Sequence, residues 1–147
     1  MNHFEDLERL LRKLSGWVRT EGRKVLKSGD YQLTPAQFDI LQKCYFHQDM
    51  TMTQLSIDLG VAKSTVTGIV TKLREAKYLD YGVSEEDKRV RNLTITDKGK
   101  TLIREVIEAR VQFIEELFSQ VDPILLSEFH QVLRIIANTL DTYRTDS

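Results

Sequence analysis

The chain has 147 residues, a length that suits one domain and is too short for two independent hydrophobic cores. Its composition, 41% hydrophobic and 29% charged with a net charge of −1, is typical of a soluble globular protein. There is no apolar run near the ~20 residues that span a bilayer, no secretory signal and no zinc-binding spacing, and the single Cys44 cannot form an internal disulfide. These features predict a cytoplasmic protein without membrane contact, metal or cofactor.

Charge is distributed unevenly along the chain. Residues 51–100 carry nine basic and seven acidic groups, whereas residues 101–147 carry four and eight. The segment 62–77 holds four basic residues against one acidic residue. Because a local basic segment that faces phosphate matters more than the net sum, the middle of the chain is a candidate nucleic-acid surface.

The N-terminal segment predicts one long helix. Asn2, with Glu5 three residues later, forms a capping-box-like pair. Apolar residues then recur at helical spacing, and nothing breaks the pattern before residues 27–30. They are Phe4, Leu7, Leu10, Leu11, Leu14, Trp17, Val18, Val25 and Leu26. A helix of roughly 35 Å carries more apolar surface than so small a body can cover, so part of it is expected to meet another chain.

Two short helices are predicted next. Thr34 is followed directly by Pro35 and, three residues after the threonine, by Gln37, which is the pattern of a capped helix start. The same threonine-to-glutamine spacing recurs at Thr51 and Gln54. This second helix is expected to end at Gly60, because glycine readily takes the left-handed conformation found at helix ends.

The helix predicted at about residues 63–76 has two contrasting faces. Its apolar residues lie at i, i+3, i+4 and i+7 and are Val66, Ile69, Val70 and Leu73. The other side carries mostly short polar residues, namely Ser64, Thr65, Thr67, Gly68, Thr71, Lys72 and Glu75. Short side chains let a helix backbone approach another surface and donate hydrogen bonds to it, as entry into the DNA major groove requires.

Apolar periodicity then changes from 3.6 to 2. Leu79, Tyr81 and Val83 alternate with polar or small residues, and so do Leu93 and Ile95, with the charged turn 84–89 between them. The pattern predicts a hairpin that must lean on the preceding helices, since a lone hairpin is marginal in water. Two further amphipathic helices are expected to start at residues 96–99 and 122–123.

Two short helices joined at residues 58–61, the second of which is the helix at 63–76 with its polar outward side, are followed by a charged hairpin. Together these elements predict a winged helix-turn-helix. The sequence also resembles the MarR family of bacterial regulators over nearly its whole length. Four stretches carry the likeness, in order and spacing: 33–38 (LTPAQF), 54–61 (QL to LGV), 64–73 (STVT to L) and 87–99 (DKR to LTITDKG).

This resemblance implies a homodimer whose first and last two helices intertwine and whose two recognition helices enter successive major grooves of a pseudo-palindromic operator. It implies that the wing reaches the minor groove through Arg89, which Asp87 orients. Many members are repressors that small aromatic or anionic ligands release. The chain departs from the family pattern at Gly68, often a larger polar residue, at Lys77, usually glycine, and at Tyr81, commonly basic.

The sequence therefore predicts a mainly α single domain, residues 1–147, with a small β-hairpin wing. Residues 1–33 and 101–147 are assigned to dimerisation, and residues 34–100 to the winged helix-turn-helix lobe. The expected function is a sequence-specific regulator of transcription, a repressor released by an effector, and no enzyme, because no catalytic constellation occurs. Predicted DNA-binding residues are Thr53, Lys63, Ser64, Thr65, Thr67, Gly68, Thr71, Lys72, Asp87, Lys88, Arg89 and Arg91.

Simpler interpretations stay open beside these. The polar face of the fourth helix and the hairpin tip could be ordinary solvated surface. Trp17, Tyr45 and Phe46 could line an effector pocket, although aromatic residues at helical spacing are more often core. Cys44 could serve a redox-responsive regulator, although a buried structural thiol is favoured. A winged helix used only for protein–protein contact is the remaining alternative.

Overall fold

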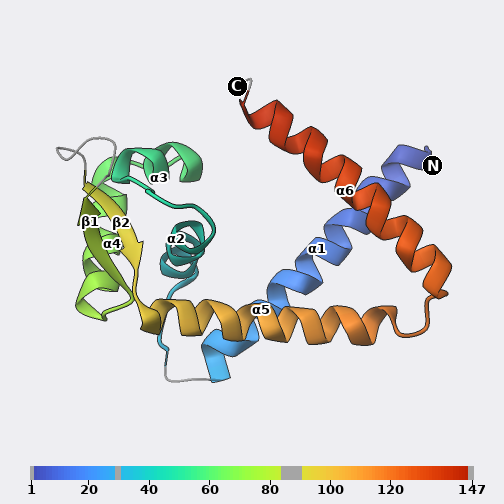
Figure 1. Cartoon of the computed structure of the whole chain (residues 1–147), viewed down its shortest axis with the longest axis horizontal. Coiled ribbons are helices and arrows are strands. Elements are labelled where there is room, and N and C mark those ends of the chain that lie inside the picture. Colours follow the sequence, from blue (N-terminus) through green and yellow to red (C-terminus); the bar gives the residue numbers. More distant parts are fainter. Residues whose placement is uncertain (1, 29–30, 84–90, 146–147) are drawn as a thin grey trace. The chain divides into compact units, whose positions relative to one another are not determined.

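The computed structural model describes residues 2–28, 31–83 and 91–145. By its internal contacts the chain divides into two units, Met1–Val111 and Gln112–Ser147. The element order, drawn in Figure 1, is α1 (His3–Ser28), α2 (Pro35–Phe46), α3 (Met52–Leu59), α4 (Lys63–Glu75), β1 (Leu79–Val83), β2 (Arg91–Ile95), α5 (Asp97–Phe118) and α6 (Pro123–Thr145). The predicted fold class, six helices with one hairpin, is confirmed.

Capping side chains start the helices where the sequence predicts. Asn2 Oδ1 accepts from the Phe4 amide at 3.1 Å, and Thr34 forms a complete capping box at α2. At α3, Thr51 Oγ1 accepts from the Gln54 amide at 3.1 Å. The Gln54 side chain donates instead to Asp58 at 2.8 Å, so this box is only half formed. Each cap satisfies amides that have no partner within the helix.

The ends of α3 and α4 fix the turns around the fourth helix. Gly60 closes α3 with φ 65°, as predicted. After α4, Lys77 also has a positive φ, 66°, and its amide and that of Tyr78 donate to the carbonyls of Arg74 and Leu73, both at 2.9 Å. This is a Schellman end, in which the residue with positive φ is most often glycine. Lysine there costs about 1 kcal/mol in backbone strain.

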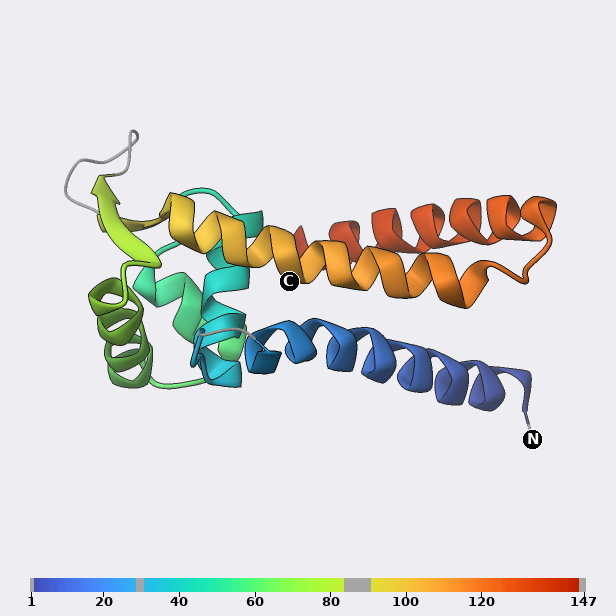
Figure 2. The ribbon, with the colours of Figure 1, turned by 90° about the horizontal axis from the view of Figure 1, so that it is seen from below.

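The core of the first unit lies among α2, α3, α4, the hairpin and the start of α5 (Figure 2). Its fully buried side chains include Ile40, Leu41, Leu55, Val66, Val70, Leu73, Leu102 and Val106. The strands pair antiparallel with Leu79 opposite Ile95, and the Leu93 amide also donates to the Met50 carbonyl at 2.8 Å. The hairpin therefore leans on the helices, as expected.

One expectation for the hairpin is wrong. The alternation places Asn92 on the polar side, but this residue is 6% exposed. Its Nδ2 donates to Asp49 Oδ1 at 2.5 Å, and a Cβ at the facing Gly82 would collide with its amide oxygen. Asp49, in the loop between α2 and α3, and the missing side chain at position 82 thus create a polar niche, which a two-residue period in the sequence does not reveal.

The second unit contains the end of α5 and α6. Phe118 and Phe129 stack with ring centroids 5.7 Å apart. The α6 residues Ile124 and Ile135 stay 71% and 66% exposed in the single chain. In the described residues, no helix combines the length and apolarity needed to cross a membrane.

Candidate nucleic-acid interface

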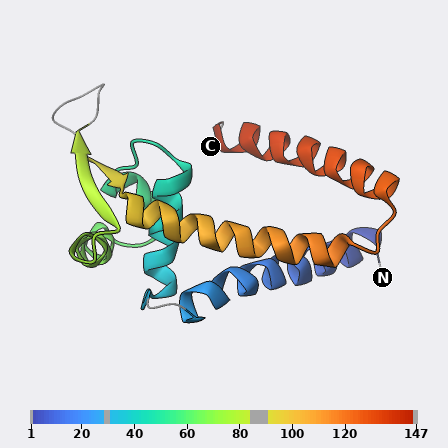
Figure 3. The same cartoon turned by 60° about the horizontal axis from the view of Figure 1, so that its bottom comes forward.

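Helix α4 is amphipathic in the way the sequence predicts. Val66, Val70 and Leu73 have no exposed surface and anchor the helix on the core. The residues of the other side are all exposed: Lys63, Ser64, Thr65, Thr67, Gly68, Thr71 and Lys72. Figure 3 looks nearly down the axis of α4 and shows it beside β1. The core thus holds this helix rigidly while its short polar residues face outward.

Two hydroxyl groups on this side are already used as donors. Thr67 Oγ1 donates to the Lys63 carbonyl at 2.9 Å, and Thr71 Oγ1 donates to the Thr67 carbonyl at 2.8 Å. In the unbound chain, each oxygen keeps lone pairs that can accept a hydrogen bond, for example from the amino group of adenine or cytosine. The sequence favours these hydroxyls as hydrogen-bond donors to DNA, whereas the structure suits them as acceptors.

The turn before α4 exposes its amino-terminal end. Ser56 Oγ donates to the Val61 carbonyl at 2.6 Å, and the Val61 amide donates to the Ser56 carbonyl at 3.2 Å, which clamps the turn. Ala62 at the cap position has no side-chain acceptor. The Thr65 amide donates to the Ala62 carbonyl at 3.0 Å, which leaves the Lys63 and Ser64 amides, without a partner in the described residues, and the positive end of the helix dipole to face a phosphate. Thr53 is exposed on neighbouring α3.

The predicted wing contacts fall into two groups. Asp87, Lys88 and Arg89 lie outside the described residues, so their assignment stays a prediction. Arg91 is the first residue of β2 and is exposed. Its guanidinium carbon lies 5.3 Å from the ring centroid of Tyr81. In the sequence, Tyr81 is only a departure from the family pattern. The structure shows that it neighbours Arg91, a predicted contact residue.

The three aromatic residues predicted for an effector pocket are placed differently from one another. Tyr45 and Phe46 meet edge to face with ring centroids 5.1 Å apart at the end of α2. Phe46 is 56% exposed, and Trp17 on α1 is 53% exposed. In the single chain these two residues are therefore not core, and the effector pocket stays a prediction.

Cys44 is buried on α2 within the core. Burial disfavours the charged thiolate and raises the pKa of the Cys44 thiol to about 12. Because the thiolate is the species that oxidants attack, this position favours a structural thiol over a redox switch.

Comparison with known proteins agrees with this geometry. The profile of the MarR family matches residues 33–90, a range that includes α2, α3, α4 and β1. The HTH-type transcriptional regulator YsmB of Bacillus subtilis is 30% identical over 118 residues, which cover 80% of each chain. The chain belongs to the MarR family.

Solved structures extend the match to nearly the whole chain. The transcriptional regulator Tm0710 of Thermotoga maritima is 41% identical with a TM-score of 0.78, covering 96% of this chain and 98% of that one. A MarR family protein of Bacillus stearothermophilus is 27% identical with a TM-score of 0.80, covering 96% and 99%. The resemblance seen in the sequence is confirmed, and with it the role of a MarR family DNA-binding transcriptional regulator.

Proposed function

We propose that this regulator binds operator DNA by inserting the exposed side of α4 into the major groove. One observation carries the proposal: residues 63–65, 67–68 and 71–72 are all exposed, although Val66, Val70 and Leu73 on the same helix are fully buried. Small polar groups, two lysines and an uncapped amino terminus suit close approach to bases and phosphates. A mutant of MepR from Staphylococcus aureus, which shares the fold at 20% identity, has been solved bound to an oligodeoxyribonucleotide.

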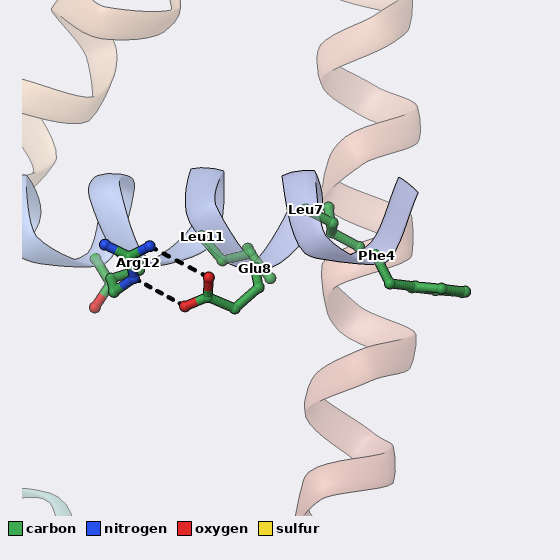
Figure 4. Close-up of a pocket in the computed structure, with 6 residues that line it drawn as sticks. Phe4, Leu7, Glu8, Leu11 and Arg12 are labelled. Atoms are coloured by element: carbon green, nitrogen blue, oxygen red, sulfur yellow. Dashed lines mark hydrogen bonds and ion pairs between the residues drawn. The ribbon is translucent and has the colours of Figure 1, made fainter. Parts of the chain in front are cut away.

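We further propose that the working species is a homodimer, with residues 1–33 and 101–147 as its dimerisation region. The amino-terminal half of α1 exposes Phe4, Leu7 and Leu11 around a hollow of about 460 Å³ (Figure 4). Helix α6 exposes further apolar residues, among them Ile124 and Ile135. Apolar patches this extensive on a single chain mark an interface.

The dimer is expected to persist in dilute solution, because separation would return these apolar side chains to water. Sedimentation equilibrium at micromolar concentration should give twice the chain mass of 17.1 kDa. A stable monomer of normal solubility at that concentration would contradict the assignment of both helical regions to dimerisation.

Arg89→Ala is expected to weaken operator binding by about 1–3 kcal/mol per site, with the melting temperature nearly unchanged. A flat, weakly hydrated guanidinium suits the narrow, negative minor groove, so Arg89→Lys should restore only part of the affinity. Asp87→Ala should fall between wild type and Arg89→Ala if that carboxylate orients the arginine. Fluorescence anisotropy at fixed salt, with a thermal melt of each variant, measures both quantities. Unaltered affinity in Arg89→Ala would remove Arg89 from the interface.

We propose repression relieved by a small aromatic or anionic effector as the mode of regulation. A relative in Escherichia coli, MprA, 23% identical over 140 residues, is named a transcriptional repressor. Adding aromatic carboxylates to the preformed complex in the same anisotropy assay tests for release, and Trp17, Tyr45 and Phe46 are the first positions to vary in an effector-responsive protein.

A further inference from the structure

Tyr81 joins three elements at the base of the wing. From α4, the guanidinium carbon of Arg74 lies 3.8 Å from the ring centroid of Tyr81. From β2, the guanidinium carbon of Arg91 lies 5.3 Å from the same centroid. Both distances are within the range of a cation–π interaction. Tyr81 itself belongs to β1, so one aromatic ring connects α4 to both strands of the hairpin.

The strand register explains why Arg91 reaches this ring. Tyr81 pairs with Leu93, and Arg91 precedes Leu93 by two residues. Residues two apart on a strand share one side of the sheet, so Arg91 is a diagonal neighbour of Tyr81. This separation is within reach of an aromatic ring and a long side chain.

The two arginines have different roles around the ring. Arg74 also forms an ion pair with Asp80 at 3.7 Å, and its Nε is buried with no hydrogen-bond partner in the described part of the chain. The ring and the carboxylate therefore hold Arg74 against the protein. Arg91 is exposed, and within the described part of the chain its guanidinium makes no hydrogen bond, so its donors can meet an outside acceptor. Asp80 offsets the charge of Arg74, which reduces the repulsion that two cations at one ring would otherwise feel.

We propose that Tyr81 is a positioning residue for DNA binding. Its ring holds the Arg91 guanidinium at the wing base in a fixed place relative to α4, so that Arg91 meets a backbone phosphate when α4 enters the major groove. Arg74 serves as the brace that ties the ring to α4. The inference rests on the proposed function, because it requires α4 and the wing to contact the same duplex.

The test compares Tyr81→Leu with Tyr81→Phe on a fluorescein-labelled duplex that the wild-type protein has selected from a random-sequence library. Tyr81→Leu removes the π face and is expected to lower affinity about three- to tenfold. The slope of log affinity against log salt should fall in magnitude by about 1, as for one lost phosphate contact. Tyr81→Phe keeps the ring and should bind as wild type.

A double-mutant cycle separates positioning from a general loss of structure. In an Arg91→Ala background, Tyr81→Leu should cause no further loss of affinity, because the group that it positions is gone. An equal loss in both backgrounds, or a loss in Tyr81→Phe equal to that in Tyr81→Leu, would overturn the inference. Thermal melts accompany each variant, and only variants that melt as folded proteins enter the cycle.

Lys72→Ala, on the exposed side of α4, is measured in parallel. If Lys72→Ala weakens binding and Tyr81→Leu does not, the inference about Tyr81 fails and the proposed docking of α4 stands. If neither substitution changes affinity, the docking proposal fails, and the inference fails with it.

Discussion

Replacing Gly99 with alanine is expected to lower the free energy of unfolding by about 2–3 kcal/mol. Gly99 is buried in the first turn of α5. A Cβ there would lie 2.5 Å from the carbonyl oxygen of Tyr78 and 2.7 Å from Cγ1 of Ile95. The isoleucine side chain can adjust, but the carbonyl belongs to the backbone and can move only if the chain around it moves.

That carbonyl is held by the junction that links the wing to α5. It accepts a hydrogen bond from the Thr96 amide at 3.1 Å and shares the single Thr96 Oγ1 proton, at 3.0 Å, with the Lys77 carbonyl at 2.7 Å. Thr96 Oγ1 also accepts from the Gly99 amide at 3.1 Å as the cap of α5. Displacing the Tyr78 carbonyl would therefore disturb the end of α4 and the start of α5 together.

Urea unfolding of the dimer at fixed protein concentration measures the effect of Gly99→Ala. Gly68→Ala is the matched control, because it makes the same chemical change at a helical position where the new Cβ meets no atom of the described chain within 4 Å. The control should raise stability by about 0.5–1 kcal/mol, since alanine is the better helix former. A Gly99→Ala protein as stable as wild type would show that the backbone at this junction can shift with little loss in the free energy of unfolding.

The sequence predicts local features of this fold well and long-range ones poorly. The caps at Asn2, Thr34 and Thr51 are set by residues within one helical turn, so their spacing is visible in the sequence. The burial of Asn92 depends on Asp49, a residue 43 positions away, and on the missing side chain at Gly82. A pattern of period two cannot report contacts of that kind.

The same division applies to the candidate interface. The exposed side of α4 follows from helical periodicity, and the structure confirms the burial of Val66, Val70 and Leu73, whereas Ile69 is only partly buried. The ring of Tyr81 between two arginines follows only from the strand register and from the packing of α4 beside β1. The wing-tip residues Asp87 and Arg89 rest on family resemblance alone, because they lie outside the described residues.

Gly68→Glu is expected to weaken operator binding about 100-fold or more while leaving the dimer at least as stable as wild type. Glycine within a helix costs about 0.5–1 kcal/mol relative to alanine, and the described chain places no atom near its missing Cβ. The fold therefore gives no reason for glycine at this exposed position of α4. Close approach of the helix backbone to a second surface does give one, and a glutamate there would add both bulk and a charge that phosphates repel.

Three substitutions separate these causes by anisotropy titration against the selected duplex, each with an unfolding curve. Gly68→Ala should gain stability and bind within about threefold of wild type, because a methyl group adds little bulk. Gly68→Gln matches the size of glutamate without its charge and should show the steric part of the loss, with a salt dependence near that of wild type. The further loss in Gly68→Glu should shrink as salt rises, because it arises from charge repulsion that ions screen. Wild-type affinity in Gly68→Glu, with the protein folded and dimeric, would mean that this side of α4 does not face DNA.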